Sequence, residues 1–487
     1  METNPSNNSR LQSAPLWSFF YAICRIPRAS GNTQALQEWL LTFARERGLT
    51  CKRDEVGNVL IRKPACSGYE LSAPVILQAH MDMVCEKNAN TVHNFEVDPI
   101  RPVIDGDWMK ADGTTLGADN GIGMAAQLAV LDDPTLRHGP VECLFTVDEE
   151  TGLNGAFGLK PGFLAGNKLI NLDSEDDGML FIGCAGGMNS MIVFRHTTME
   201  APSNYFYFQV TVKGLQGGHS GDDIDKGRGN ANQLLARYLN HLRTETDVVL
   251  HAFDGGNLSN AIPREATCLA GVPYAMKEEV RVLLNVSQAD LEDEFGPLEP
   301  NLSLTLTSEP KPETVVIPDE SNRFISALYA CPNGVMSMSH ALPGLVETSL
   351  NLASVKSAGP GKWIITTSQR SSVESAKQAL SLRLEALFNL AGMEVSHGEG
   401  YPGWKPNPDS ELVTLVSTAY KDLFGNAPLV RAIHAGLECG LFLNTYPYLD
   451  MVSFGPTMRG VHSPDERLQI STVEPFWLLL TETLKRL

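Results

Sequence analysis

Residues 74–82, PVILQAHMD, form an apolar run that ends in a histidine and an aspartate two positions apart. A short apolar run of this kind predicts a buried β-strand. Successive side chains of a strand point to opposite faces, so we expect His80 and Asp82 to face the same way. In an open parallel sheet, ligands bind in the crevice beyond the carboxyl ends of the strands. Alone, such a pair is more often structural than catalytic, so a functional site here requires partners from elsewhere in the chain.

Length and composition predict a globular protein of more than one domain. The chain has 487 residues, of which 43% are hydrophobic and 20% are charged. Its 57 acidic and 38 basic residues give a formal charge of −19, which argues against nucleic acid or an anionic membrane as partner. The nine cysteines show no CxxC spacing, so we expect reduced core residues rather than disulfides or a thiolate zinc site.

The sequence predicts a cytoplasmic protein. The N-terminal stretch METNPSNNSRLQSAPLW is polar and has no apolar core of the length that a secretory signal requires. No later segment approaches the run of about 18 apolar residues that a membrane-spanning helix needs.

Strands that alternate with helices predict the fold class. Buried strands are expected at 75–80, 141–147 and 168–172, and each leads into acidic residues. The glycine-rich stretch 117–123 opens an apolar helix that continues to residue 131. This pattern predicts an α/β protein with an open, mostly parallel sheet and a site at one edge of it.

A change of pattern inside the chain predicts an inserted domain. Alternating strands and amphipathic helices occupy residues 187–398, and the α/β pattern returns afterwards. We therefore expect a catalytic domain in two pieces, 1–186 and 399–487, interrupted by an α+β domain at 187–398. Within the insert, the order strand, helix, strand, strand, helix can be read through 188–296 and again through 302–397. No residue-level repeat accompanies it, so an internal duplication is a hypothesis.

Several acidic residues and a late histidine are candidates to join His80. They are Asp119, Glu149, Glu150, Asp173 and His462. Imidazole and carboxylate groups are suitable ligands for zinc and other divalent transition metals. One catalytic metal uses three protein ligands, so this larger set predicts two metals about 3.5–4 Å apart that share a carboxylate. Burying so many carboxylates without a cation would be costly.

Motifs along the chain resemble those of a known enzyme family. They are HMDMV at 80–84, GADNGIG at 117–123, VDEETG at 147–152, NLDSED at 171–176, GGHSG at 217–221 and RGVHSPDE at 459–466. Together they resemble the di-zinc metallopeptidases that include carnosinases, glutamate carboxypeptidases and aminoacylases. HAGLECG at 434–440 and NAIPREA at 260–266 narrow the resemblance to the aminoacyl-histidine dipeptidases, also called peptidase D or Xaa-His dipeptidases.

The resemblance implies a metal centre with five ligands, namely His80, Asp119, Glu150, Asp173 and His462. In this arrangement Asp119 bridges the two metals. His80 and Asp173 complete one site, and Glu150 and His462 complete the other. The implied cofactors are two Zn²⁺ ions per subunit, with Co²⁺ or Mn²⁺ as alternatives.

The resemblance also implies roles for neighbouring residues. Asp82 would stand behind His80, Glu149 would be the general base, and the Asp119–Asn120 peptide would be cis. The chemistry agrees, because two metals lower the pKa of water and a carboxylate beside them can take its proton. Adjacent residues of an extended segment point in opposite directions, which agrees with Glu150 binding metal while Glu149 faces the water.

The insert is expected to act as a lid or dimerisation domain that supplies further site residues. His219 resembles the family histidine that stabilises the oxyanion, delivered either within the chain or from a partner subunit. Asn260 and Arg370 resemble substrate-binding residues, and a guanidinium suits the free carboxylate of a short peptide. Gly436 would let the backbone approach that carboxylate. The alternatives are that His219 orders only its own loop and that Arg370 forms a surface salt bridge.

These inferences predict a hydrolase of unblocked dipeptides, preferentially Xaa-His, with small peptide substrates and a homodimeric state expected from the resemblance. A related exopeptidase or deacylase, such as a tripeptidase or an aminoacylase, would use the same metals with a different pocket. A catalytically inactive binding protein with the same fold is a third hypothesis. The complete set of candidate ligands and the presence of Glu149 argue against an inactive protein.

Overall fold

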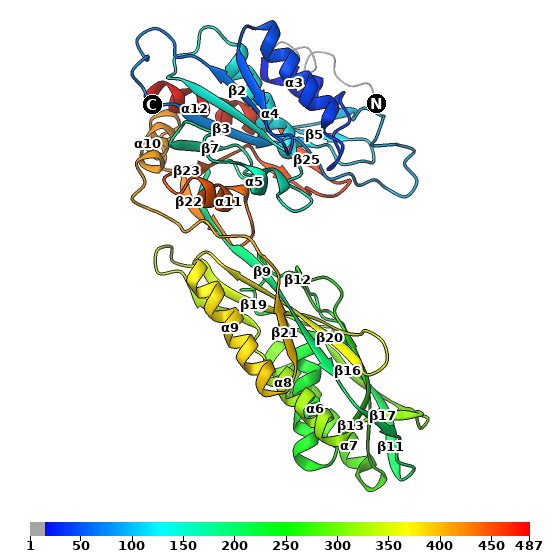
Figure 1. The fold of residues 1–487 in the computed structure, drawn as a ribbon. Coiled ribbons are helices and arrows are strands. Elements are labelled where there is room, and N and C mark those ends of the chain that lie inside the picture. Colours follow the sequence, from blue (N-terminus) through cyan, green and yellow to red (C-terminus); the bar gives the residue numbers. More distant parts are fainter. Residues whose placement is uncertain (1–14) are drawn as a thin grey trace. The chain divides into compact units, whose positions relative to one another are not determined.

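A computed structural model describes residues 15–487 and divides into two units (Figure 1). Unit 1 comprises the described residues up to Gly183 together with Pro406–Ala432 and Leu437–Leu487, and unit 2 comprises Cys184–Lys405 and Ile433–Gly436. Most of the polar N-terminal stretch, residues 1–14, lies outside the described residues. The division of the chain into independently folding domains at residues 187 and 398 remains a prediction.

An eight-stranded mixed sheet forms the centre of unit 1. Its order is β1 (Thr50–Arg53), β2 (Val59–Lys63), β6 (Val141–Thr146), β3 (Val75–His80), β7 (Lys168–Asn171), β23 (Asp450–Ser453), β8 (Met179–Cys184) and β22 (Leu429–Ile433). The central strands β6, β3, β7 and β23 run parallel, whereas β1, β2 and β8 pair antiparallel. All residues of β3 and β6 are buried, as expected for parallel strands covered on both faces.

Helices pack around this sheet. They are α2 (Pro15–Cys24), α3 (Gln34–Glu46), α4 (Ala118–Asp132), α5 (Asn154–Gly158), α10 (Glu411–Phe424), α11 (Glu438–Thr445), the 3₁₀ turn η2 (Ile470–Thr472) and α12 (Val473–Arg486). Helix α4 packs against β3 and α2, which explains why it is apolar on nearly every side. Its first turn is irregular at Asp119 and Asn120, and the peptide between them is cis, as the resemblance implied. Among residues 15–487, no helix is both long and apolar enough to cross a membrane.

A second, small sheet in unit 1 was not predicted. Its order is β24 (Met458–Arg459), β25 (Arg467–Gln469), β5 (Trp108–Ala111) and β4 (Pro102–Asp105). These strands are two to four residues long, which is too short to leave a periodic pattern. Strands β24 and β25 flank His462, so this sheet fixes both ends of the loop that carries it.

Unit 2 is built on a nine-stranded antiparallel sheet. Its order is β16 (Ser303–Glu309), β11 (Tyr205–Lys213), β15 (Ala266–Pro273), β13 (Val249–Gly255), β19 (Val346–Ser357), β20 (Lys362–Ser371), β9 (Gly186–Arg195) and β21 (Glu394–His397), with β18 (Gly334–Met338) beside β19. Two further strand pairs are β10 (Thr198–Glu200) with β17 (Thr314–Val316), and β12 (Gly218–His219) with β14 (Ala261–Ile262). The helices are η1 (Tyr274–Met276), α6 (Ala231–Glu245), α7 (Lys277–Phe295), α8 (Pro318–Ala330) and α9 (Glu374–Leu390).

The two halves of this sheet share one topology. The order β16-β11-β15-β13 is matched by β21-β9-β20-β19, and each half carries two helices at corresponding points of the chain. The predicted halves, 188–296 and 302–397, were wrong in their limits. Strand β9 begins the second half but precedes the whole first half, and β16 completes the first half by pairing with β11. One half is therefore inserted into the other.

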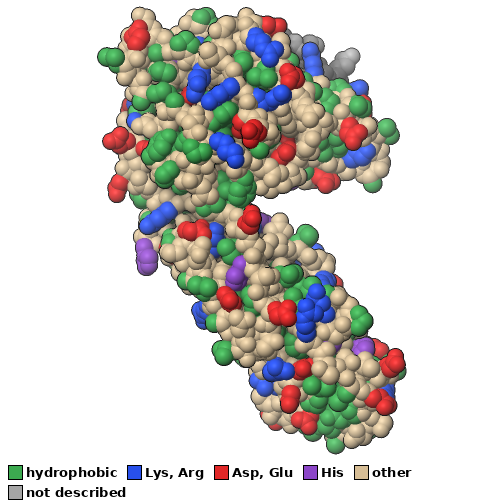
Figure 2. Space-filling model, viewed as in Figure 1, with side chains coloured by type: hydrophobic (Ala, Val, Ile, Leu, Met, Phe, Trp, Pro, Cys, Tyr) green, Lys and Arg blue, Asp and Glu red, His purple; other side chains and the backbone are tan. Residues whose placement is uncertain are grey.

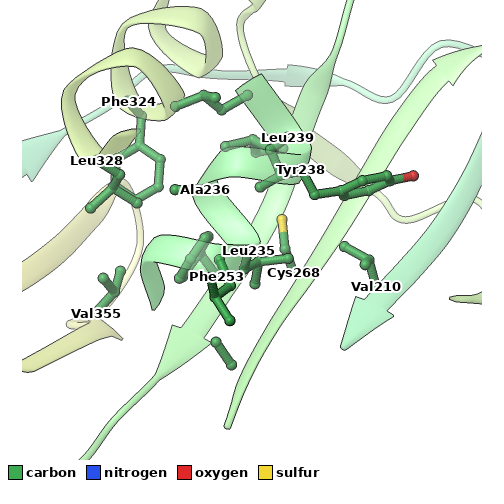
Figure 3. Close-up of a cluster of buried hydrophobic side chains, with 14 of the residues drawn as sticks. Val210, Leu235, Ala236, Tyr238, Leu239, Phe253, Cys268, Phe324, Leu328 and Val355 are labelled. Atoms are coloured by element: carbon green, nitrogen blue, oxygen red, sulfur yellow. The ribbon is translucent and has the colours of Figure 1, made fainter. Parts of the chain in front are cut away.

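Aromatic and aliphatic side chains fill the space between this sheet and its helices. Figure 3 shows Tyr238 from α6 and Phe324 from α8 among them, together with strand residues such as Phe253. The Phe324 ring lies 4.7 Å from the Trp363 ring and 5.0 Å from the Phe194 ring, measured between centroids. The Tyr238 hydroxyl donates to the carbonyl of Val280, so its buried polar atom is satisfied.

Truncation of Phe324 should destabilise the protein. Phe324 is fully buried, so Phe324→Ala removes ring contacts and leaves a cavity, and we expect a loss of about 3–5 kcal/mol. Chemical denaturation monitored by Trp fluorescence measures it. The matched control is Leu382→Ala on α9, where a side chain 62% exposed should change stability by less than about 0.5 kcal/mol. Equal effects of the two substitutions would contradict this assignment of the core.

Candidate metal centre

The carboxyl ends of the central strands bring the predicted ligands together in unit 1. His80 is the last residue of β3 and is 1% exposed. Glu149 and Glu150 follow β6, and Asp173 follows β7, the two strands that flank β3 in the sheet. The parallel direction of these three strands is what places residues distant in sequence at one edge.

His80, Asp119 and Asp173 form one group that could hold a metal ion. The Nε2 atom of His80 lies 2.9 Å from Oδ1 of Asp119 and 3.3 Å from Oδ1 of Asp173. Two ligand atoms that are each about 2.0–2.1 Å from a tetrahedral zinc ion lie roughly 3.3 Å apart. The spacing of these side chains is therefore close to that of ligands around a single cation.

Asp119, Glu150 and His462 form a second group of the same kind. The Nε2 atom of His462 lies 3.3 Å from Oδ2 of Asp119 and 3.0 Å from Oε2 of Glu150. Asp119 thus offers Oδ1 to the first group and Oδ2 to the second. One carboxylate with an oxygen in each of two ligand groups is the arrangement that a pair of adjacent cations requires.

Glu149 lies close to both groups. His80, Glu149 and Glu150 also have ligand atoms within 4.8 Å of one another. Burial raises the pKa of Glu149 well above its usual value, and the carboxylates of Asp173 and Glu150 add to the effect. A buried carboxyl group with a raised pKa beside a metal site has the properties of a general base, although its geometry also allows it to be a ligand.

The electrostatics of the site favour a bound cation. Burial raises the pKa of Asp173 to about 7, and hydrogen bonds with Asp119 and Glu150 raise the pKa of His462 to about 11. Oε1 of Glu150 is buried without a hydrogen-bond donor. Metal binding releases protons from its ligands, so these residues fit divalent cations that would take the place of the protons.

Asp82 lies next to Nδ1 of His80, on the opposite side of the ring from Asp119. Its carboxylate oxygen is 3.5 Å from Nδ1 of His80, and its backbone carbonyl is nearer, at 3.1 Å. The same carboxylate accepts from the backbone N–H groups of Glu149 and Glu150 and from the Ser30 hydroxyl. Although burial alone would raise its pKa, hydrogen bonds with His80 and Ser30 lower the pKa of Asp82 to about 2. Asp82 therefore joins His80 to the segment that carries Glu149 and Glu150.

Sequence reasoning missed Glu438, which belongs to the motif HAGLECG. Its carboxyl group is 1% exposed and accepts from Gln78 Nε2 at 2.6 Å and from the Thr146 hydroxyl at 2.7 Å. Burial raises the pKa of Glu438 to about 8. Gln78 lies on the same face of β3 as His80, so Glu438 is near the candidate ligands. It belongs to none of the groups that could hold a metal ion.

The other predicted residues lie in unit 2. Arg370 is 7% exposed, so it is not the surface salt bridge that was the alternative. It donates to the Tyr401 hydroxyl at 3.2 Å, its Nη2 is 3.5 Å from Nε2 of His219, and its Nε has no acceptor. Asp222 lies 3.4 Å from Nδ1 of His219. A buried guanidinium with an unused donor is suited to bind an anionic ligand.

Asn260 and Gly436 also have structural roles near His219 and Arg370. The carbonyl of Asn260 accepts from the N–H of Ser220, next to His219. A Cβ atom at position 436 would lie 2.9 Å from the Tyr401 ring, so close packing requires glycine there. His434 accepts a hydrogen bond from, or donates one to, the Ser349 hydroxyl at 2.7 Å, and burial lowers the pKa of His434 to about 4.

Comparison with known proteins supports a single family. Residues 76–486 match the model of peptidase family M20/M25/M40. The chain is 46% identical over 482 residues to the cytosol non-specific dipeptidase of Escherichia coli, covering 99% of both chains. It shares 44% identity and a TM-score of 0.93 with the structure of aminoacylhistidine dipeptidase from Vibrio alginolyticus, again over 99% of each chain.

A more distant structure shares the fold alone. Human carnosine dipeptidase 1 has a TM-score of 0.51 and 14% identity, over 98% of this chain and 97% of that one. From the match along most of its length and the identity to these relatives, the chain belongs to peptidase family M20/M25/M40.

Proposed function

We propose that this protein is a metal-dependent dipeptidase that hydrolyses unblocked dipeptides at a two-cation centre in unit 1. The main support is the position of Asp119, whose two oxygens face His80 on one side and His462 on the other. The close relatives named as dipeptidases support the substrate class. His80 and Asp173 would hold one cation, and Glu150 and His462 the other.

The chemistry assigns distinct roles to the residues around this centre. Two cations held by these residues would supply a water of lowered pKa and would polarise the scissile carbonyl. Glu149 takes a proton from the attacking water and returns it to the departing amine. Asp82 holds the His80 ring in its binding orientation. His219 donates to the developing oxyanion, Arg370 pairs with the substrate carboxylate, and Asn260 and Gly436 shape the same subsite in unit 2.

The proposed substrates are dipeptides with free ends, with Xaa-His among the preferred ones. The Vibrio alginolyticus relative is named for aminoacylhistidine, whereas the Escherichia coli relative is named as non-specific. We therefore propose hydrolysis of several dipeptides rather than of one. An arginine with a buried, unused donor favours a substrate whose carboxylate is free.

We also propose zinc as the native metal, a cytoplasmic location and a homodimeric state. The histidine and carboxylate ligands suit zinc, although Co²⁺ and Mn²⁺ would fit the same set. The relative from Escherichia coli is named as a cytosol enzyme, which supports the location. On the face shown in Figure 2, basic side chains are scattered among acidic ones, and the formal charge is −19, which supports a small substrate rather than a nucleic acid.

Hydrolysis should depend on a divalent metal and on a free dipeptide. We expect chelator-treated enzyme to be inactive and to recover with Zn²⁺, Co²⁺ or Mn²⁺, because without a cation nothing lowers the pKa of the attacking water. A panel of Xaa-His, other dipeptides, tripeptides and N-acylated amino acids, assayed by release of free amine, identifies the substrate class. Preferred hydrolysis of tripeptides or N-acylated amino acids would contradict the assignment as a dipeptidase.

Replacement of Glu149 should separate catalysis from metal binding. We expect Glu149→Gln to retain both cations by elemental analysis and to lose roughly 10²–10⁴-fold in kcat, because an amide cannot accept the proton. Asp173→Asn is the matched comparison, since it should lower the metal content itself. Normal turnover by Glu149→Gln would refute its role as base, and loss of one metal would identify it as a ligand.

A further inference from the structure

The carboxylate of Glu466 binds the backbone of the segment that carries Asp119. Its Oε2 accepts from the N–H groups of Leu116 and Gly117 at 2.7 and 3.0 Å. Its Oε1 accepts from the N–H groups of Ala118 and Asp119 at 2.8 and 3.3 Å. The side chain is 2% exposed. One buried carboxylate therefore satisfies four consecutive amides at the start of α4, where the helix dipole also favours a negative charge.

Arg28 binds the same segment by donating to a backbone carbonyl, that of Gly117. Its guanidinium donates to the carbonyls of Met81 and Asp82 at 2.9 and 2.8 Å and also to the carbonyl of Gly117. Arg28 is 2% exposed. Gly117 has a φ of 67°, and a Cβ atom there would lie 2.5 Å from the guanidinium, so only glycine lets the chain come this close.

These contacts connect three segments that each carry a proposed ligand. Glu466 lies four residues after His462 and holds the backbone N–H of Asp119. Arg28 ties the Gly117 carbonyl to the two residues that follow His80. All of these hydrogen bonds go to backbone atoms. Glu466 and Arg28 therefore hold the backbone of the segments that carry the proposed ligands.

We propose that Glu466 and Arg28 are positioning residues that fix Asp119 between the two cation sites, an inference that rests on the proposed function. Shared coordination needs both Asp119 oxygens within a few tenths of an ångström of their places, because metal–ligand distances tolerate little variation. A carboxylate that accepts from four amides fixes that backbone more firmly than a neutral group could. In Glu466→Gln, the new amide nitrogen would face backbone N–H donors, leaving two of them without an acceptor.

The test compares metal affinity in two glutamate variants of the full-length protein. Glu142 is the matched control, because it is also 2% exposed and accepts from the N–H groups of Ala165 and Gly166 at 2.8 and 2.9 Å. It lies near the opposite end of β6 from Glu149, in a part of the unit that carries no proposed ligand. Competition with a chromophoric zinc chelator measures the dissociation constants of the wild-type protein, Glu466→Gln and Glu142→Gln, and thermal unfolding of the metal-free forms measures stability.

We expect Glu466→Gln to bind Zn²⁺ about 10–100-fold more weakly than the wild type, the usual effect of removing a residue that orients metal ligands. Glu142→Gln should lower the melting temperature but keep wild-type affinity. Arg28→Lys, which cannot reach all three carbonyls at once, should also weaken Zn²⁺ binding. If Glu466→Gln does not fold, Glu466→Asp takes its place and should show a smaller loss of affinity.

Three outcomes would overturn the proposal. They are wild-type affinity in the folded Glu466 variant, wild-type affinity in Arg28→Lys, and an equal loss of affinity in Glu142→Gln, which would show that affinity follows general stability. Failure of the proposed function itself gives a different result, because the wild-type protein would then bind fewer than two zinc ions per chain.

Discussion

Mutual repulsion of buried carboxylates is the constraint on which unit 1 depends. Asp119, Glu149, Glu150 and Asp173 converge where the parallel strands end, together with the imidazoles of His80 and His462. Without a cation, protons have to compensate, as the raised pKa values of Asp173 and Glu149 indicate. So many acidic groups in a desolvated place are costly unless a divalent ion pairs with them, which makes the carboxylate cluster a strong argument for metals.

The sheet beneath the cluster is built to keep the ligands in place. Gln78, Asn171 and Ser453 stand side by side on three adjacent parallel strands and are joined by side-chain hydrogen bonds. Glu438 closes this row by accepting from Gln78. Hydrogen-bonded polar side chains in a core favour one register of the strands, since a shift would leave these buried groups unpaired. The strands that carry His80 and Asp173 are thus held in register by residues outside the two groups that could hold a metal ion.

Much of the fold, and the residues that meet in the two candidate metal-binding groups, could be predicted because the signals are local. Each central strand is an apolar run that ends in acidic residues, as at His80 and Asp82, and the motif order then identified the family. The features that were not predicted depend on contacts between segments far apart in the sequence. The short strands around His462 leave no periodicity, and the exchange of β9 between the halves of unit 2 appears only in the sheet order. Glu466 was visible in the motif RGVHSPDE, but its four backbone partners are about 350 positions away and no side-chain pattern encodes them.

The proposed function depends on two adjacent cations that share Asp119. Anomalous diffraction from crystals grown with Zn²⁺ locates the metals directly, without reference to activity. We expect two peaks about 3.5–4 Å apart, one beside His80 and Asp173 and the other beside Glu150 and His462, with Asp119 between them. A single peak, or peaks remote from Asp119, would contradict it.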